Sequence, residues 1–173
     1  MRPLVMSVVL LAATVTALPS QAQSAPAATP CASPEHRQFD FWVGEWTVTR
    51  PDGGPAGTSR IESVLGGCAL LEHWEAAKGG AGKSLTLYVA ADREWNQTWV
   101  DAQGNRIVLT GGWDGTRMVL RNAWTGAKGE AMRSELSWTP SADGRVRQVW
   151  RQSSDDGTTW TTTFDGTYTR TAR

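Results

Sequence analysis

Glu72 is the acidic residue of this 173-residue sequence whose position suggests chemistry. It alternates with Leu70 and Trp74, so in an extended strand it would share their apolar face. Burial raises the pKa of a carboxyl group toward the range that suits proton transfer. Glu72 therefore supports the hypothesis of an enzyme that isomerises or cyclises an apolar molecule. The competing explanation is structural, an internal ion pair or hydrogen bond, for example to an arginine.

Side-chain amides follow the same alternation as the tryptophans, which places both on the faces that we expect to point inward. The predicted ligand-binding residues on these faces are Glu72, Trp74, Gln97, Trp99, Asn122, Trp124, Trp138, Gln148 and Trp150. An interior filled only for stability would use aliphatic side chains, because each buried amide costs roughly 2 kcal/mol or more unless it is hydrogen-bonded. We therefore expect a cavity that binds a small, largely apolar molecule. The alternative is a structural or accessory barrel whose polar groups satisfy one another or trapped water.

The elements that must position these residues are short strands. From Trp42 onward, about ten runs rich in Trp, Val, Leu and Thr alternate with period two between turn signals. The turn signals are Asp52-Gly53-Gly54, Gly66-Gly67, Lys78-Gly79-Gly80, Gln103-Gly104-Asn105, Asp114-Gly115, Gly126 to Gly129, Asp143-Gly144 and Asp156-Gly157. Such turns join antiparallel neighbours, and closure of the meander removes its two exposed edges. The sequence predicts an all-β fold, a single antiparallel meander barrel of about ten strands.

The N-terminal region divides into three segments. Residues 1–22 combine Arg2, an apolar run and a small-x-small ending, which is typical of a secretory signal peptide and too short to span a bilayer comfortably. Residues 23–33 are rich in Ala, Pro and Ser and are predicted to be a flexible leader. The barrel domain, residues 34–173, is expected to begin with a short helix over residues 34–39, with Ser33 as its N-cap. The predicted location is periplasmic or secreted.

Cys31 and Cys68 are the two cysteines of the sequence. An even number of cysteines in an exported chain favours a disulfide, which would contribute roughly 3 to 4 kcal/mol by restricting the unfolded chain. A lipid anchor on Cys31 is the alternative, but it would require a small-residue lipobox directly after the apolar run.

Several classes of function are disfavoured by composition and by missing motifs. Seventeen basic and seventeen acidic residues balance, which argues against a nucleic-acid or anionic-membrane partner. The motifs of serine hydrolases, zinc proteases, dinucleotide enzymes and P-loop proteins do not occur. We expect no metal and no cofactor, and the oligomeric state is not indicated.

Gly44-x-Trp46 at the entry to the first strand, together with Arg170 in the last strand, resembles the lipocalin and calycin signature. In that signature the tryptophan closes the base of the barrel and a basic residue of the final strand packs over it. The resemblance implies that Trp46 and Arg170 form a cation–π pair and that Gly44, Trp46 and Arg170 are structural.

The whole expected domain resembles an uncharacterised family of exported bacterial lipocalin-like proteins, through the segments 39–46, 67–74 and 146–150. That family carries no function to transfer. A more distant resemblance is to nitrobindin-like barrels, which hold haem through a histidine late in the chain. No histidine follows His73 here, and His73 lies on the face opposite Glu72, so haem binding is not expected.

Residues 153–160 match the Asp-box pattern S-x-D-x-G-x-T-W of sialidases and other propeller proteins. In those proteins the motif stabilises a hairpin turn. One such motif in one small domain predicts a hairpin and does not indicate glycan cleavage.

Overall fold

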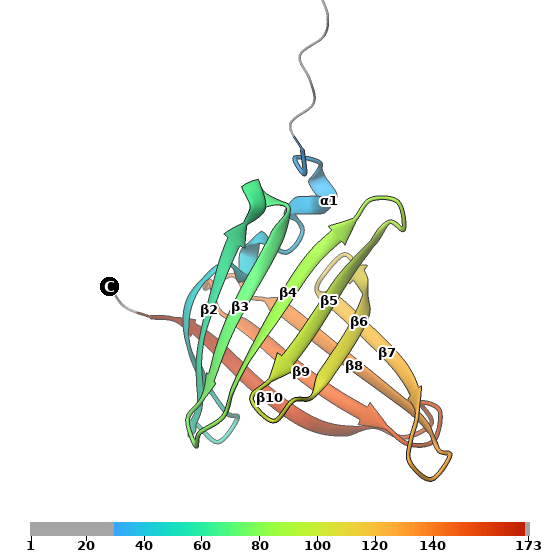
Figure 1. The fold of residues 1–173 in the computed structure, drawn as a ribbon. Coiled ribbons are helices and arrows are strands. Elements are labelled where there is room, and N and C mark those ends of the chain that lie inside the picture. Colours follow the sequence, from blue (N-terminus) through green and yellow to red (C-terminus); the bar gives the residue numbers. More distant parts are fainter. Residues whose placement is uncertain (1–29, 172–173) are drawn as a thin grey trace, which may run out of the picture.

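Residues 30–171 are described by the computed structural model, and they form a closed barrel of antiparallel strands (Figure 1). The elements are α1 (Pro34–Arg37), η1 (Asp40–Trp42), β1 (Gly44–Thr49), β2 (Pro55–Val64), η2 (Leu65–Gly67), β3 (Ala69–Ala76), β4 (Ala81–Val89), β5 (Glu94–Asp101), β6 (Arg106–Trp113), β7 (Met118–Thr125), β8 (Ala131–Pro140), β9 (Val146–Ser153) and β10 (Thr161–Arg170). Consecutive strands pair, and β1 pairs with β10 to close the ring. The predicted meander barrel is confirmed, whereas the predicted signal peptide and residues 23–29 of the leader lie outside the described residues.

All eight predicted turn segments join consecutive strands. Several of their glycines, such as Gly53 and Gly144, adopt the positive φ angles that tight reversals need. The β4–β5 connection lacks a glycine, and Arg93 takes the left-handed conformation there with φ of 56°. That turn had no sequence signal because a non-glycine residue occupies the unusual conformation.

The N-terminal helix is shorter than predicted. It ends at Arg37, because Phe39 turns inward and is completely buried. Ser33 occupies the N-cap position, but its hydroxyl donates to the Glu35 carboxylate, 2.6 Å away, and makes no capping bond to the backbone. The predicted N-cap residue is therefore confirmed, but its side chain does not cap the helix, because the charged acceptor takes the hydroxyl.

A disulfide between Cys31 and Cys68 joins the segment before α1 to the start of β3. The predicted bridge is confirmed, and the bonded sulfur of Cys31 is incompatible with a lipid anchor on that atom. Arg37 adds a hydrogen bond to the carbonyl of Gly67. These links hold α1 at one end of the barrel, beside the ends of β2, β3 and β4 (Figure 1).

An aromatic plug, made of Phe39, Trp42, Trp95 and Trp138, closes the barrel end next to α1. All four side chains are buried, and the Phe39 ring lies 4.9 to 5.7 Å from the rings of the three tryptophans. The Trp95 indole also donates to the amide oxygen of Gln38, 3.2 Å away. The plug ties the segment after α1 to β5 and β8, and its four side chains belong to the buried core.

Trp46 and Arg170 form the predicted pair beside the plug. The Arg170 guanidinium carbon lies 4.4 Å from the centre of the Trp46 ring, and the guanidinium donates to the carbonyl of Val43. Gly44 has a φ of 145°, and a Cβ atom there would come within 2.4 Å of the Arg170 guanidinium. Glycine is therefore required at position 44 because the arginine crosses directly over its backbone.

The outer face of the barrel carries paired charges, as expected for the polar set of alternating residues. Glu135 on β8 accepts from Arg121 and Arg151 on the neighbouring strands. His73 points outward, as predicted, and lies 3.0 Å from the Glu62 carboxylate. Within residues 30–171, helical segments are too short and too polar to cross a bilayer.

Replacing Gly44 by alanine is expected to lower the free energy of unfolding by roughly 2 to 3 kcal/mol, through a strained φ angle and displacement of Arg170 from Trp46. Gly112→Ala is the matched control, since Gly112 on β6 has open space around its Cβ position and no positive φ. Urea denaturation of both variants tests this, and equal stability of the two would contradict the assigned role of Gly44.

Candidate functional site

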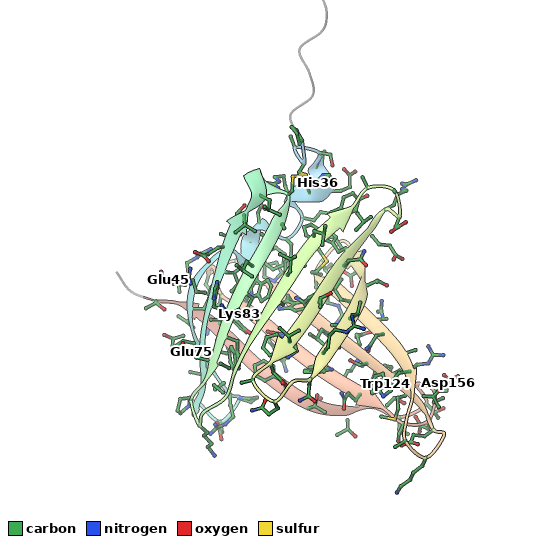
Figure 2. The ribbon with its side chains drawn as sticks, in the orientation of Figure 1. His36, Glu45, Glu75, Lys83, Trp124 and Asp156 are labelled. Atoms are coloured by element: carbon green, nitrogen blue, oxygen red, sulfur yellow. A yellow bond between two sulfur atoms is a disulfide. The ribbon has the colours of Figure 1, made fainter. Side chains whose placement is uncertain are left out.

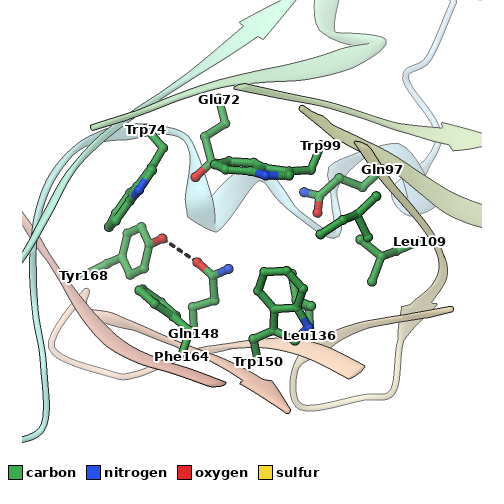
Figure 3. Close-up of a pocket in the computed structure, with 11 residues that line it drawn as sticks. Glu72, Trp74, Gln97, Trp99, Leu109, Leu136, Gln148, Trp150, Phe164 and Tyr168 are labelled. Carbon is green, nitrogen blue, oxygen red and sulfur yellow. Dashed lines mark hydrogen bonds between the residues drawn. The ribbon is translucent and has the colours of Figure 1, made fainter. Parts of the chain in front are cut away.

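Side chains leave a cavity of about 130 Å³ in the lumen on the far side of the plug (Figure 3). The cavity is lined by Glu72, Trp74, Gln97, Trp99, Ile107, Leu109, Leu136, Gln148, Trp150, Phe164 and Tyr168. Glu72, Gln97, Leu109, Leu136 and Tyr168 are buried, whereas Trp74, Trp150 and Phe164 are partly exposed. The cavity thus has a buried inner part and an aromatic rim toward the barrel end opposite α1.

Glu72 on β3 is the ionisable acid of this cavity, with 5 % of its surface exposed. One carboxylate oxygen accepts from the Ser59 hydroxyl at 3.0 Å, and the other accepts from the Ser84 hydroxyl at 2.9 Å. Among the described residues no arginine, lysine or histidine pairs with Glu72, so the suggested arginine partner is not found there. Hydrogen bonds from serines on β2 and β4 hold the carboxyl group instead.

Burial raises the pKa of Glu72 from 4.5 to about 7, although hydrogen bonds from Ser84 and Ser59 oppose the rise. The cause is loss of water around the charged form, which the two neutral hydroxyls replace only in part. Glu72 therefore changes charge near neutral pH.

Two amides and a phenol complete the polar side of the site. The Gln97 amide nitrogen donates to the Thr86 hydroxyl at 2.9 Å and to the Ser84 hydroxyl at 3.4 Å. The Tyr168 hydroxyl donates to the amide oxygen of Gln148. Burial, and then the charge of Glu72, raises the pKa of Tyr168 well above its usual value, so the phenol stays neutral.

These bonds leave one polar atom of each amide directed at the cavity. With its nitrogen engaged, Gln97 keeps its oxygen as an acceptor; with its oxygen engaged, Gln148 keeps its nitrogen as a donor. In Figure 3, Glu72, Trp99 and Gln97 project from one wall of the cavity, and Gln148 and Trp150 project from the opposite wall.

Glycines on the inward positions of adjacent strands make room for the indoles of the wall. A Cβ atom on Gly82 would come within 2.1 Å of the Trp99 ring, and one on Gly57 would come within 2.9 Å of the Trp74 ring. Both indoles therefore lie flat against the backbone of a neighbouring strand. Trp74 also packs edge-on against Phe164, with 5.8 Å between ring centres. This arrangement keeps two large side chains out of the centre of the lumen.

Six of the nine predicted ligand-binding residues meet in this cavity: Glu72, Trp74, Gln97, Trp99, Gln148 and Trp150. They come from β3, β5 and β9. Their shared inward phase, read from the alternation in the sequence, agrees with the structure.

Trp138 lies in the aromatic plug and does not line the cavity. It points inward, as its phase predicts, but it lies at the barrel end next to α1. There the centre of its ring is 5.1 Å from the centre of the Phe39 ring. Its buried indole nitrogen has no hydrogen-bond partner among the described residues. Trp138 is a packing residue because of its depth along the barrel axis.

Asn122 and Trp124 also lie outside the cavity. β6 pairs with β7 only through Thr110–Trp113, so the two strands separate before they reach Asn122. Both residues line a surface groove between these strands, and Trp124 is 39 % exposed at the barrel end opposite His36 (Figure 2). Ile107 and Trp150 line both the groove and the cavity. The groove is thus adjacent to the cavity through these two side chains.

Five cavity residues were missing from the predicted set: Ile107, Leu109, Leu136, Phe164 and Tyr168. Leu136 shares the phase of Trp138 on β8, and alternation along β10 would have identified Phe164 and Tyr168 as inward neighbours. The pattern of tryptophans with polar neighbours does not mark these residues. Ile107, Leu109 and Leu136 are aliphatic, and β10 contains no tryptophan.

The Asp-box segment forms the β9–β10 turn at the rim. Ser153 and Asp155 bond backbone nitrogens of the turn, and Trp160 donates to the carbonyl of Gly157 at 3.0 Å. The motif thus stabilises a hairpin, as predicted. Among residues 30–171, acidic, histidine and cysteine side chains form no cluster that would hold a metal ion.

Comparison of the sequence with protein-family models gives no match, and neither does comparison with curated proteins. The resemblance to lipocalin-like families therefore stays a prediction.

The raised pKa of Glu72 predicts a pH-dependent stability. Between pH 4.5 and about 7 the folded state keeps a proton that the unfolded state releases, so stability falls as pH rises through this window. Glu72→Gln should remove this fall in stability. The difference in unfolding free energy between the variant and the wild type should therefore change by roughly 3 kcal/mol between pH 4.5 and about 7.

Urea denaturation at several pH values measures the effect. Glu75→Gln is the matched control because Glu75 lies on the same strand with an exposed side chain. A pH-independent difference between Glu72→Gln and wild type would show that Glu72 keeps its ordinary pKa in the fold.

Proposed function

We propose that the protein binds a small, largely apolar molecule in the cavity between the plug and the barrel rim, and that it acts as a carrier. The observation that carries the proposal is the combination of aromatic walls with unengaged polar atoms on Gln97 and Gln148. Ligand pockets are typically apolar with a few polar groups that fix orientation.

The size of the cavity limits the ligand. A cavity of about 150 Å³ lined by aliphatic and aromatic side chains binds benzene, and the volume here is about 130 Å³. One aromatic ring fits the inner part, and a longer molecule would extend past Trp74 and Trp150 toward the rim. The groove between β6 and β7 supports an approach from the side, because Ile107 and Trp150 border both spaces.

Two features favour a carrier over a barrel that binds nothing. Gly57 and Gly82 keep the indoles of Trp74 and Trp99 against the wall, whereas a barrel built for stability would let such rings fill the lumen. Burial of Glu72 beside two serines also lowers stability when the carboxyl is ionised, which a purely structural interior has no reason to retain.

We also propose that the protein works outside the cytoplasm. The Cys31–Cys68 disulfide fits an oxidising compartment. The lipocalin-like classification and the signal peptide of residues 1–22 belong to the same proposal, and they rest on the sequence motifs.

A second candidate function is acid–base catalysis on the bound molecule. It is favoured by the pKa of about 7 at Glu72, which suits a proton acceptor at neutral pH. An enzyme would lose turnover in Glu72→Gln while still binding neutral molecules, and unchanged turnover would exclude Glu72 as the catalytic base.

Binding is tested by isothermal titration calorimetry with neutral single-ring molecules such as toluene, phenol and benzyl alcohol, together with tryptophan fluorescence. We expect saturable one-to-one binding to the wild type. Gly82→Ala should weaken it at least about tenfold, or 1.4 kcal/mol, because the added methyl group pushes the Trp99 ring into the cavity.

Gly112→Ala is the matched control for this variant, since its Cβ has open space on β6. Its affinity should equal that of the wild type. Absence of binding across the whole panel would overturn the proposed carrier function.

A further inference from the structure

The cavity contains an acid without a base. Glu72 is the ionisable group that lines it besides the neutral Tyr168, and no lysine, arginine or histidine is among the lining residues. When Glu72 is ionised, the two serine hydroxyls are its partners in the described structure, and neither carries a positive charge. A buried carboxylate of this kind is strongly stabilised by a cation placed beside it.

The polar atoms around Glu72 select hydrogen-bond donors. Each carboxylate oxygen accepts one serine hydroxyl and keeps further acceptor capacity. The Gln97 oxygen, on the same wall of the cavity, is a second acceptor (Figure 3). A ligand group with several N–H donors would satisfy both residues, whereas a carboxylate ligand would be repelled by Glu72.

The aromatic wall favours the same charge. Trp74, Trp99 and Trp150 surround the cavity, and the faces of indole rings attract cations. The attraction increases where the site is shielded from bulk solvent, and the inner part of the cavity is lined by buried side chains.

We infer that the ligand is a small amine bound as its ammonium ion, with the ammonium group at Glu72 and Gln97 and the apolar part between the indoles. This inference rests on the proposed carrier function and names the chemical class of the molecule carried. It also gives the buried carboxyl a role, because the ligand supplies a counter-ion that residues 30–171 do not provide.

Amine binding should depend on pH through Glu72. The groups that face this carboxyl are Ser59 from β2, Ser84 from β4, Gln97 from β5 and Tyr168 from β10, and of these only Tyr168 titrates. Because the pKa of Tyr168 lies well above its usual value, a change in affinity near neutral pH reports on Glu72. The ammonium ion stabilises the ionised carboxylate, so binding below about pH 7 should release a proton.

The test compares benzylamine with benzyl alcohol, which have the same shape and differ in charge. At about pH 8, where the amine is still protonated, calorimetry should show benzylamine binding at least about tenfold more tightly to the wild type. The preference should shrink at about pH 5, where Glu72 is protonated. Titrations near pH 6 in buffers of different ionisation enthalpy should reveal the released proton.

Glu72→Gln should remove the preference for benzylamine over benzyl alcohol, while Glu75→Gln should keep the wild-type preference. The pH dependence of benzylamine affinity and the proton release are both measured on the wild type, so they test the inference even if the variant does not fold.

The outcomes separate the two proposals. If benzyl alcohol binds as tightly as benzylamine, the ammonium inference fails and the carrier function stands. A benzylamine preference that persists in Glu72→Gln also overturns the inference, because the charge would then be recognised elsewhere. If neither molecule binds, the carrier function fails and the inference fails with it.

Discussion

Closure of the meander by the β1–β10 pair is the constraint on which the rest of the structure depends. Once the ring is closed, alternate residues of every strand are forced into a common interior or onto the outer face. Trp46 on β1 and Arg170 on β10 lie across this pairing, and Gly44 provides the space that the arginine needs. The β1–β10 pairing thus determines which side chains can meet in the interior, and the candidate site is one result of it.

The aromatic plug divides the interior into two regions. Near α1 the rings of Phe39, Trp42 and Trp138 pack against one another within the buried core. Beyond the plug Trp74 and Trp99 lie against glycine backbones, and the lumen opens around Glu72. The same residue type therefore fills space at one end of the barrel and lines it at the other. A tryptophan that packs against another ring fills the lumen, whereas one that packs against a glycine lines it.

Strand phase could be predicted from the sequence, but depth along the barrel axis could not. Alternation correctly assigned Glu72, Gln97 and Gln148 to the interior, because a period of two depends only on local backbone geometry. Trp138 and Trp124 have the same phase and yet lie at the plug and in the surface groove. Their depth depends on strand register, tilt and the early separation of β6 from β7, none of which leaves a mark in the local pattern.

Glu72 shows how a stability cost and the proposed binding role arise from one arrangement. The two serines supply hydrogen bonds but no charge, so the carboxyl keeps a pKa near 7 and the ionised form remains unfavourable in the ligand-free barrel. An arginine partner would relieve this cost, but it would also occupy the lumen and neutralise the carboxylate. Hydroxyl partners leave the remaining lone pairs directed at the cavity. No counter-ion for Glu72 is found among residues 30–171, which leaves the acid available to the proposed ligand. The fold tolerates burial of the group because it can take up a proton.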